Sequence, residues 1–466
     1  MTASGGRLPA AAEVVERGLA AAAPGSGCVV LVSDKSEAEV RFANNTTTTN
    51  GVRRDRRVTV VSFREGSAGT AAAVVSRSGV VDVGELVRAA EADAADADDA
   101  DDAFPLVGGG ADPDFAADPE LTGLGILGGV VGGLGDAFGR ARSAGRVLAG
   151  FAEHSVVTTS LGISTGVRRR HVQPTGRMQL VARTGDGTGS AWAGVGSPDF
   201  ADVDLGSLEA RLVKRLGWGR RRLELEPGRY ETILPPDAVA DLVCMVGEAV
   251  GGRDAEEGHS VFSTPGGGTR LGELLSPLPF QLRSDPAEPG LECAPFLATS
   301  VSAGDVSVFD NAVALESTAW ISGGRLARLR YHRAGAARSG ALPGFPVDNL
   351  VLELPGAGAT VEDLVARTDR GLLLTCLWYI REVDPSTLLL TGLTRDGVYL
   401  VEGGEITGSV TNFRFNESPL DLLGRAVEAG RTERALSREW NEYFPRTAMP
   451  ALRIPDFNMS SVSPAT

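Results

Sequence analysis

The chain has 466 residues and a formal net charge of −15, from 45 Lys and Arg against 60 Asp and Glu. An acidic surface repels the phosphate backbone, so the charge argues against non-specific binding to nucleic acid. With 42% hydrophobic residues the composition is that of a globular protein, and the length predicts two or more domains.

The cysteines and the apolar segments bear on where the protein resides. The four cysteines are scattered: Cys28, Cys244, Cys293 and Cys376. None forms a CxxC pair and a chain of this size needs no disulfides, so we expect a cytoplasmic protein. Glu13, Glu16 and Arg17 interrupt any signal-peptide core, and the apolar stretch 121–134 is too short to cross a bilayer. We therefore expect no membrane partner.

Residues 1–222 alternate between helical and strand patterns, which predicts an N-terminal α+β domain of the α/β-sandwich kind. Helices are predicted at 9–23, 83–95, 134–152 and 208–216. Strands are predicted at 28–33, 38–44, 58–63, 71–76, 155–164 and 176–184. A turn at Glu65-Gly66 joins the third and fourth of these strands.

Two charged segments interrupt this pattern. The acidic one supplies Glu91, Asp93, Asp96, Asp98, Asp99, Asp101 and Asp102. With the Gly- and Pro-rich residues that follow, 91–118 is predicted to be a solvated connector, or else an acidic interaction tail. The basic cluster Arg168-Arg169-Arg170-His171 is interpreted as a solvated hairpin end, with contact to an acidic partner as the alternative.

Residues 223–462 are predicted to form a larger, mainly antiparallel β domain. It opens with Pro227-Gly228-Arg229-Tyr230 and a helix at 237–250, and has further helices at 361–367 and 420–429. Its strands are predicted at 306–309, 312–315, 326–331, 349–354, 371–379, 388–392, 397–401 and 409–415.

The helix at 237–250 resembles a zinc-peptidase helix in the position of a Glu, but it lacks the metal ligands. Such peptidases place two His on one helical face, with a neighbouring Glu as general base. Glu248 has the position of that Glu, but Gly247 and Gly252 stand where the two His are required. Glycine offers no donor atom, so no metal site is predicted in this chain and Glu248 is at most a weak catalytic candidate.

No other segment completes a catalytic constellation. The four His residues are His154, His171, His259 and His332, and no two are close enough in sequence for a local metal pair. His259 follows Glu256-Glu257, so a Glu/His site is conceivable beside the simpler reading of a loop residue. Cys376 lies in an apolar strand pattern that favours a buried structural thiol. The Gly-rich stretches 185–189 and 266–272 lack the features of a P-loop or dinucleotide motif.

Several segments in order resemble the TldD/PmbA family, and specifically its TldE (PmbA) branch. They are 227–242, 347–354, 371–378, 383–387 and 397–407, with Asn44-Asn45 and Gly51-Val52 as an N-terminal counterpart. In the TldD branch the helix carries His-Glu-x-x-x-His, with a later Cys as a further zinc ligand. Laid over this chain the two His fall on Gly247 and Gly252, only Glu248 is retained, and no Cys follows Cys376.

The resemblance implies a heterodimer in which a TldD-like partner subunit holds the zinc. It also implies a shared cavity that admits unfolded or leader peptides, with this chain as the non-catalytic subunit. A second hypothesis is a stand-alone, possibly homodimeric, peptide-binding scaffold that holds an extended peptide by strand addition. A third is a peptidase that uses Cys376 or His259 in an unfamiliar site.

Overall fold

The computed structural model, which describes residues 9–67 and 69–463, has two β-sheets with helices packed on them. One sheet has six strands and lies in the N-terminal half, and the other has fourteen and lies in the C-terminal half. The predicted α+β class, with the larger sheet second, is confirmed. The first eight residues of the predicted N-terminal domain lie outside the described residues.

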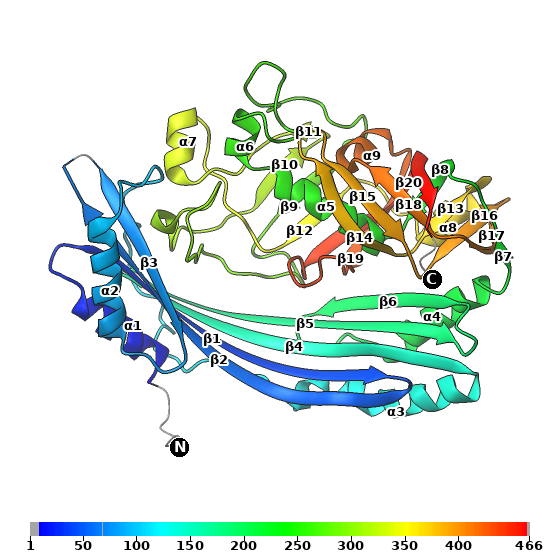
Figure 1. Cartoon of the computed structure of the whole chain (residues 1–466), viewed down its shortest axis with the longest axis horizontal. Helices are drawn as coiled ribbons and strands as arrows, with labels where there is room; N and C mark the ends of the chain where they lie inside the picture. The colour runs from blue at the N-terminus through cyan, green and yellow to red at the C-terminus, as the bar shows by residue number, and fades with distance from the viewer. Residues whose placement is uncertain (1–8, 68, 464–466) are drawn as a thin grey trace.

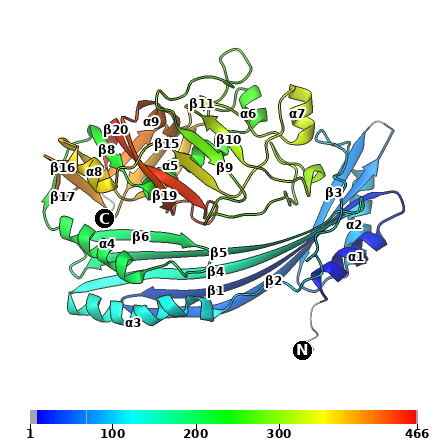
Figure 2. The ribbon, with the colours of Figure 1, turned by 180° about the vertical axis from the view of Figure 1, so that it is seen from behind.

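The N-terminal sheet is long, curved and antiparallel, with strand order β3-β2-β1-β4-β5-β6. Its strands are β1 (Gly27–Ala43), β2 (Thr46–Glu65), β3 (Thr70–Ser78), β4 (Arg146–Ile163), β5 (Arg168–Thr184) and β6 (Ser190–Ser197). Helices α1 (Ala11–Ala21), α2 (Val83–Asp96), α3 (Gly128–Ser143) and α4 (Leu205–Trp218) lie along its outer face. The C-terminal half covers the opposite face (Figures 1 and 2).

Both faces of this sheet are buried, because successive side chains of a strand point to opposite sides. Val30 and Val32 of β1 pack in one cluster with residues of α1 and α2. Val29 packs in a different cluster that includes Phe309 of the C-terminal half. The rings of Phe63 and Phe309 lie 4.8 Å apart between centroids, so the two halves share a hydrophobic contact.

The strands are longer than the sequence predicts. Segments 28–33 and 38–44 form the single strand β1, because the charge of Asp34 is compensated by Arg56 on β2 and does not interrupt the ladder. The Arg56 Nε atom lies 2.6 Å from Asp34 Oδ1, and both side chains are buried. The predicted helix 134–152 is wrong beyond Ser143, because Gly145 adopts a φ of 64° that ends the helix before β4.

The basic cluster is not the solvated hairpin end that the sequence favours. Arg168, Arg169 and Arg170 lie within β5 and form ion pairs with Glu16, Asp112 and Asp114, respectively. The acidic partners therefore come from α1 and from the chain's own connector. These ion pairs hold the end of the predicted connector against the sheet, and the short 3₁₀ helix η1 (Leu124–Leu127) follows it.

The C-terminal sheet has the path β11-β10-β9-β12-β20-β8-β13-β16-β17-β7, with β14, β15, β18 and β19 joined at its side. The strands are β7 (Arg222–Leu223), β8 (Gly228–Leu234), β9 (Gln281–Ser284), β10 (Thr318–Ser322), β11 (Arg325–Leu326), β12 (Leu350–Glu353), β13 (Arg370–Leu374), β14 (Leu377–Asp384), β15 (Leu389–Thr394), β16 (Val398–Glu402), β17 (Glu405–Val410), β18 (Phe413–Glu417), β19 (Glu428–Ala435) and β20 (Thr447–Val462). Most pairs are antiparallel, as predicted, and β12–β20, β13–β8 and β17–β7 are parallel.

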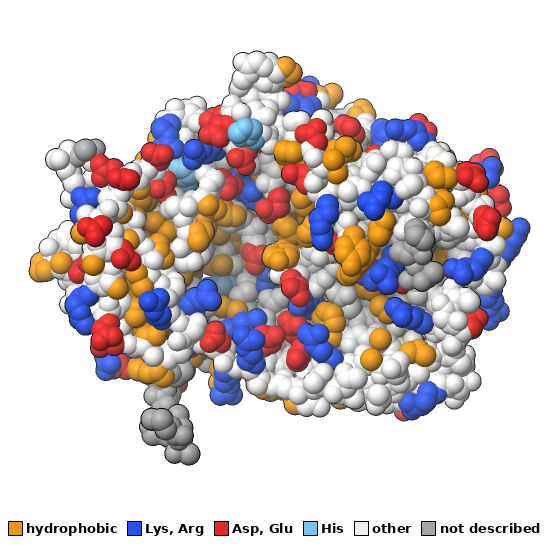
Figure 3. All heavy atoms as spheres, viewed as in Figure 1, with side chains coloured by type: hydrophobic (Ala, Val, Ile, Leu, Met, Phe, Trp, Pro, Cys, Tyr) orange, Lys and Arg blue, Asp and Glu red, His pale blue; other side chains and the backbone are white. Residues whose placement is uncertain are grey.

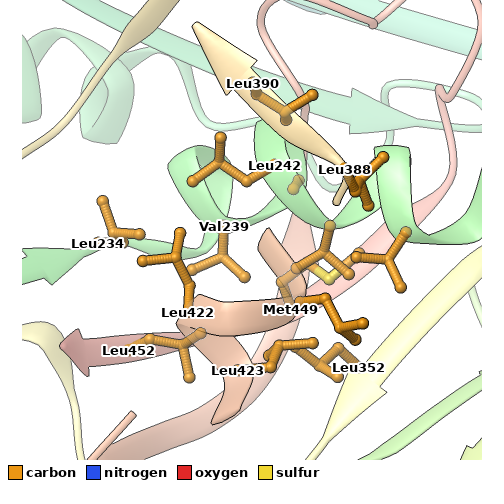
Figure 4. Packing of buried hydrophobic residues seen from close by; sticks show 14 of the residues in the cluster. Leu234, Val239, Leu242, Leu352, Leu388, Leu390, Leu422, Leu423, Met449 and Leu452 are labelled. Carbon is orange, nitrogen blue, oxygen red and sulfur yellow. The ribbon is translucent and has the colours of Figure 1, made fainter. Parts of the chain in front are cut away.

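Helix α5 (Pro236–Ala249) runs through the centre of this half and confirms the predicted helix 237–250. The other helices are α6 (Gly252–Glu256), α7 (Arg333–Ser339), α8 (Val361–Ala366) and α9 (Pro419–Arg425). Figure 4 shows Val239 and Leu242 of α5 packed among Leu residues of the surrounding strands and of α9. Pro236 starts the helix at a position where its missing N–H is harmless.

Several predictions for the C-terminal half are wrong in detail, and one of them, the helix at 420–429, ends at Arg425 before β19 begins at Glu428. Segment 306–309 overlaps a 3₁₀ turn, η2 (Val308–Asp310), and 312–315 is a loop that starts with Ala312 at a φ of 69°. Segment 326–331 keeps only Leu326 within a strand. Strand β20 was not predicted, because Pro450 and Pro455 interrupt its pattern.

Among the described residues, every helix is too short or too polar to cross a membrane.

The buried pair of Asp34 and Arg56 should be a large contributor to the stability of the N-terminal sheet. We expect Asp34→Ala to lower the free energy of unfolding by about 3–5 kcal/mol, because it leaves the Arg56 guanidinium buried without its partner. Glu39→Ala, which breaks the exposed pair with Arg41, should cost less than about 1 kcal/mol. Denaturant unfolding of both variants checks this, and equal losses would contradict it.

Candidate functional site

The C-terminal end of α5 places Gly247 and Glu248 at the surface of a cavity. A Cβ atom on Gly247 would lie 3.0 Å from the Cδ2 atom of Leu350, the end of a flexible side chain. The Glu248 side chain is 52% exposed, and its Oε1 atom lies 3.9 Å from Nη1 of Arg330. Arg330 Nη2 also donates to the backbone carbonyl of Glu248 (2.8 Å), so this guanidinium lies at the end of the helix.

Gly252 lies against an aromatic ring. A Cβ atom there would be 2.1 Å from the Cζ atom of Tyr331, so the ring fills the space that any side chain would need. Two backbone hydrogen bonds hold the segment of Tyr331 against Gly252. Gly252 N donates to Arg330 O (2.8 Å), and Arg330 N donates to Val250 O (2.7 Å). Burial and a hydrogen bond to Glu256 (2.8 Å) raise the pKa of Tyr331, which stays a neutral phenol.

The residues around this helix end do not fit a zinc ion. Zinc sites in proteins use three or four N, S or O donors in close array. Over the ranges 9–67 and 69–463, no three His, Cys, Asp or Glu side chains are grouped so that they could hold a metal. Glu248 has no second donor beside it at Gly247 or Gly252, and the ring of Tyr331 occupies the side-chain space at Gly252.

A cavity of about 560 Å³ opens beside Gly247 and Glu248. We call it the aromatic pocket, and its apolar walls include Met245, Trp320, Leu350, Trp440, Tyr443 and Phe444. Its charged lining residues are Glu248, Arg330 and Asp348. A largely apolar cavity of this volume with a few polar groups is the usual form of a site for a small ligand or a peptide side chain.

One wall of the aromatic pocket is the loop between β19 and β20, residues 436–446, which is held by two buried carboxyl groups of α5. Leu436 N donates to Asp237 Oδ1 (3.0 Å). Ser437 Oγ (2.7 Å) and Glu439 N (2.9 Å) both donate to Asp241 Oδ1. Burial raises the pKa of Asp237, and raises that of Asp241 to about 8. The loop that carries Trp440 is therefore fixed to the helix by groups far from water.

Cys376 lies between β13 and β14, not within a strand as predicted, and is buried. Burial raises the pKa of its thiol to about 12. Arg438 contacts its sulfur, forms an ion pair with Asp396 (2.9 Å) and lies over the ring of Trp378. A thiol held in this form is a poor nucleophile.

The four His residues lie apart in the fold. His154 is buried between Thr122 and Pro198, and His332 accepts a hydrogen bond from Gly335 at the start of α7. His259 is 71% exposed, with its Nδ1 atom 3.8 Å from Glu257 Oε2. His171 bonds to Gln173, so the hydrogen-bond and ion-pair partners of the four His in the described part of the chain are other residues than Glu248 and Cys376.

Sequence reasoning missed Tyr331, Arg330 and the loop 436–446. The first two follow β11, far along the chain from α5, and only the tertiary fold brings them to it. The aromatic run Trp440…Tyr443-Phe444 was a visible signal, because large apolar side chains next to charged ones in a loop often line a binding site.

Gly252 should tolerate no side chain while Tyr331 is present. We expect Gly252→Ala to destabilise the fold by about 3 kcal/mol, at the upper end for overpacking, because its Cβ overlaps the ring. In a Tyr331→Ala background the same change should cost less than about 1 kcal/mol. Gly247→Ala is the matched control and should be neutral or mildly stabilising. Equal costs of Gly252→Ala in both backgrounds would contradict the overlap.

Asp241 should make stability depend on pH. Its pKa is about 8 in the folded chain and near 3.9 when unfolded, so the folded state binds the extra proton between these values. The stability that Asp241 contributes is thus complete below about pH 4 and is lost as the pH rises toward 8. Over this range the free energy of unfolding falls by at most about 1.4 kcal/mol per pH unit. Asp241→Asn should flatten the unfolding free energy over this range, whereas exposed Asp421→Asn should not. Parallel curves for wild type and Asp241→Asn would rule this out.

The comparisons with known proteins agree with this architecture. Residues 227–461 match the family described as the PmbA/TldA metallopeptidase C-terminal domain. TldE from Thermococcus kodakarensis is similar in structure over 96% of this chain and 98% of its own, with a TM-score of 0.74 and 16% identity. A protein described as a modulator of a DNA gyrase, from Thermotoga maritima, is similar over 96% of this chain and 99% of its own. Its TM-score is 0.76 and its sequence identity 16%.

A second protein described as a modulator of DNA gyrase, from Bacteroides thetaiotaomicron, is similar over 97% of this chain and 98% of its own. Its TM-score is 0.70 and its sequence identity 14%. At such identities these likenesses show the fold alone. The search of curated proteins finds no match. The family match covers half of the sequence, which is enough to assign the chain. The protein belongs to the PmbA/TldD metallopeptidase family.

Proposed function

We propose that this chain is the TldE-type, non-catalytic subunit of a heterodimeric zinc metallopeptidase that acts on unfolded or leader peptides. The zinc and the catalytic His residues belong to a TldD-like partner subunit. This chain completes the peptide cavity and stabilises its partner. The pair works in the cytoplasm, where the four cysteines, all buried and free of disulfides, stay reduced.

The observation that carries the proposal is the pair of glycines at the two His positions of the zinc-peptidase motif, with Gly247 near the end of α5 and Gly252 at the start of α6. Neither residue has a donor atom, and the Tyr331 ring fills the side-chain space at Gly252. A single His substitution at that position could not restore a ligand without displacing the ring. The arrangement supports a subunit whose own helix has a structural role, while a partner supplies the metal.

The mixed charge of the surface is consistent with a peptide ligand and not with nucleic acid. Figure 3 shows acidic and basic side chains interspersed over the face that it presents. The formal net charge of −15 argues against non-specific binding of a phosphate backbone. The alternative, a stand-alone and in one form homodimeric peptide-binding scaffold, shares these features but has no zinc-bearing partner and no peptidase activity.

Native mass spectrometry of the tagged chain, purified from its own cells, separates these two functions. We expect a one-to-one complex with a second chain of similar size that carries His-Glu-x-x-x-His, with one zinc lost on denaturation. Glu248→Gln in this chain should leave both the complex and its zinc content unchanged, because the metal belongs to the partner.

Substitution of both His residues in the partner by Ala is the matched test of where the zinc lies. It should remove the zinc and the peptidase activity while the complex persists. A zinc-free monomer or homodimer of the present chain would overturn the proposal and favour the scaffold. A zinc ion that stays with this chain after the complex is dissociated would contradict the assignment of the metal.

A further inference from the structure

The aromatic pocket has a composition suited to a positively charged side chain. Four aromatic residues line it, namely Trp320, Trp440, Tyr443 and Phe444. Aromatic rings attract a cation held over their faces, and the attraction grows when water is excluded. The pocket lies against the end of α5 that carries Glu248, so a carboxylate and several rings surround the same space.

The polar edges of the two indole rings are bonded within the protein. Trp320 Nε1 donates to Ser284 Oγ (3.0 Å), and Trp440 Nε1 donates to the backbone carbonyl of Asp241 (2.9 Å). These N–H groups are therefore not available to a ligand, and the rings offer it carbon surface. In the part of the chain that is described, the Arg and Lys side chains that lie over aromatic rings use other rings, such as those of Phe151, Trp218 and Trp378.

The charges at the pocket leave one carboxylate in excess. Arg330 forms an ion pair with Asp305, which lies outside the pocket, and Asp348 forms one with Arg446. Glu248 has only the longer approach of 3.9 Å to Arg330, whose charge Asp305 already compensates. With Glu248, Asp305 and Asp348 against Arg330 and Arg446, the pocket and its immediate partners favour a single added positive charge.

We propose that the aromatic pocket binds the side chain of a lysine or arginine in an extended peptide, with the cation between the aromatic rings and Glu248. The volume of about 560 Å³ accommodates the long aliphatic stem of either residue, which packs on Met245 and Leu350. That the ligand is a peptide rests on the proposed function. The preference for a basic residue follows from the rings and the charge balance alone.

Isothermal titration of the full chain with blocked pentapeptides tests the proposal. The peptides are N-acetylated and C-amidated, with alanines around a central Lys, Arg, norleucine or Glu, so that the termini carry no charge. Norleucine is the matched control for the aliphatic stem. The Lys and Arg peptides should bind at least about tenfold more tightly than the norleucine peptide, and the Glu peptide should bind most weakly.

Variants separate a binding role from a structural one. Glu248→Gln should remove most of the preference for Lys over norleucine, and Tyr443→Leu, at a residue 72% exposed, should reduce it. Glu405→Gln, an exposed carboxylate away from the pocket, should retain it. Equal affinities for Lys and norleucine peptides, no binding of any peptide, or an undiminished preference in Glu248→Gln would each overturn the inference.

The outcome is independent of the test of the proposed function. If the titration fails while the one-to-one zinc complex forms, only the assignment of the pocket is wrong. If a Lys preference is measured but no zinc-bearing partner co-purifies, the pocket assignment stands and the heterodimer is wrong. Formation of the one-to-one complex by Glu248→Gln is measured on the same preparations as the peptide titration. A loss of the Lys preference with the complex intact then reports on the pocket and not on the heterodimer.

Discussion

The contact between two buried carboxyl groups of α5 and the loop 436–446 is the interaction on which the candidate site depends. Asp237 and Asp241 accept backbone and hydroxyl hydrogen bonds from this loop through their side chains, and Trp440 of the loop donates a further one to the backbone carbonyl of Asp241. The loop has little regular structure of its own, so its position is set by these bonds. These bonds hold the loop that carries Trp440 and Phe444, which line the aromatic pocket together with Glu248.

Burial of these acids is costly, and the fold reduces the cost by favouring their neutral form. A carboxyl group away from water has a raised pKa, and a protonated one still accepts hydrogen bonds through its carbonyl oxygen. The positive charge of Arg438, which also pairs with Asp396, acts to lower the pKa of Asp241, but burial outweighs it. A metal-bearing helix would need a different arrangement, with donor groups aimed at the ion. Here the polar groups of α5 are used for packing of the loop.

Local features of the sequence predicted α5 well and the surroundings of α5 poorly. The helix was predictable because it starts at a Pro and carries a continuous apolar run, and the two Gly residues were visible as missing donors. Tyr331 was not, because its contact with Gly252 depends on a backbone bridge between Arg330 and Gly251 that joins distant segments. The long strand β1 was divided at Asp34, since a charge in a strand reads as a break until its partner Arg56 is known.

The residues that line the aromatic pocket all lie in the C-terminal half, but the N-terminal sheet also holds its walls in place. Arg446 contacts Asp348 on one wall and Thr175 of β5, and Arg177 of β5 contacts Asn441 and Glu442 beside the other wall. Both walls are thus attached to one strand of the N-terminal sheet. The hydrophobic cluster that joins Phe63 to Phe309 fixes the same two halves. A C-terminal fragment cut near residue 222 would lose that cluster and the loop's contacts with β5, so the N-terminal sheet supports the walls of the pocket.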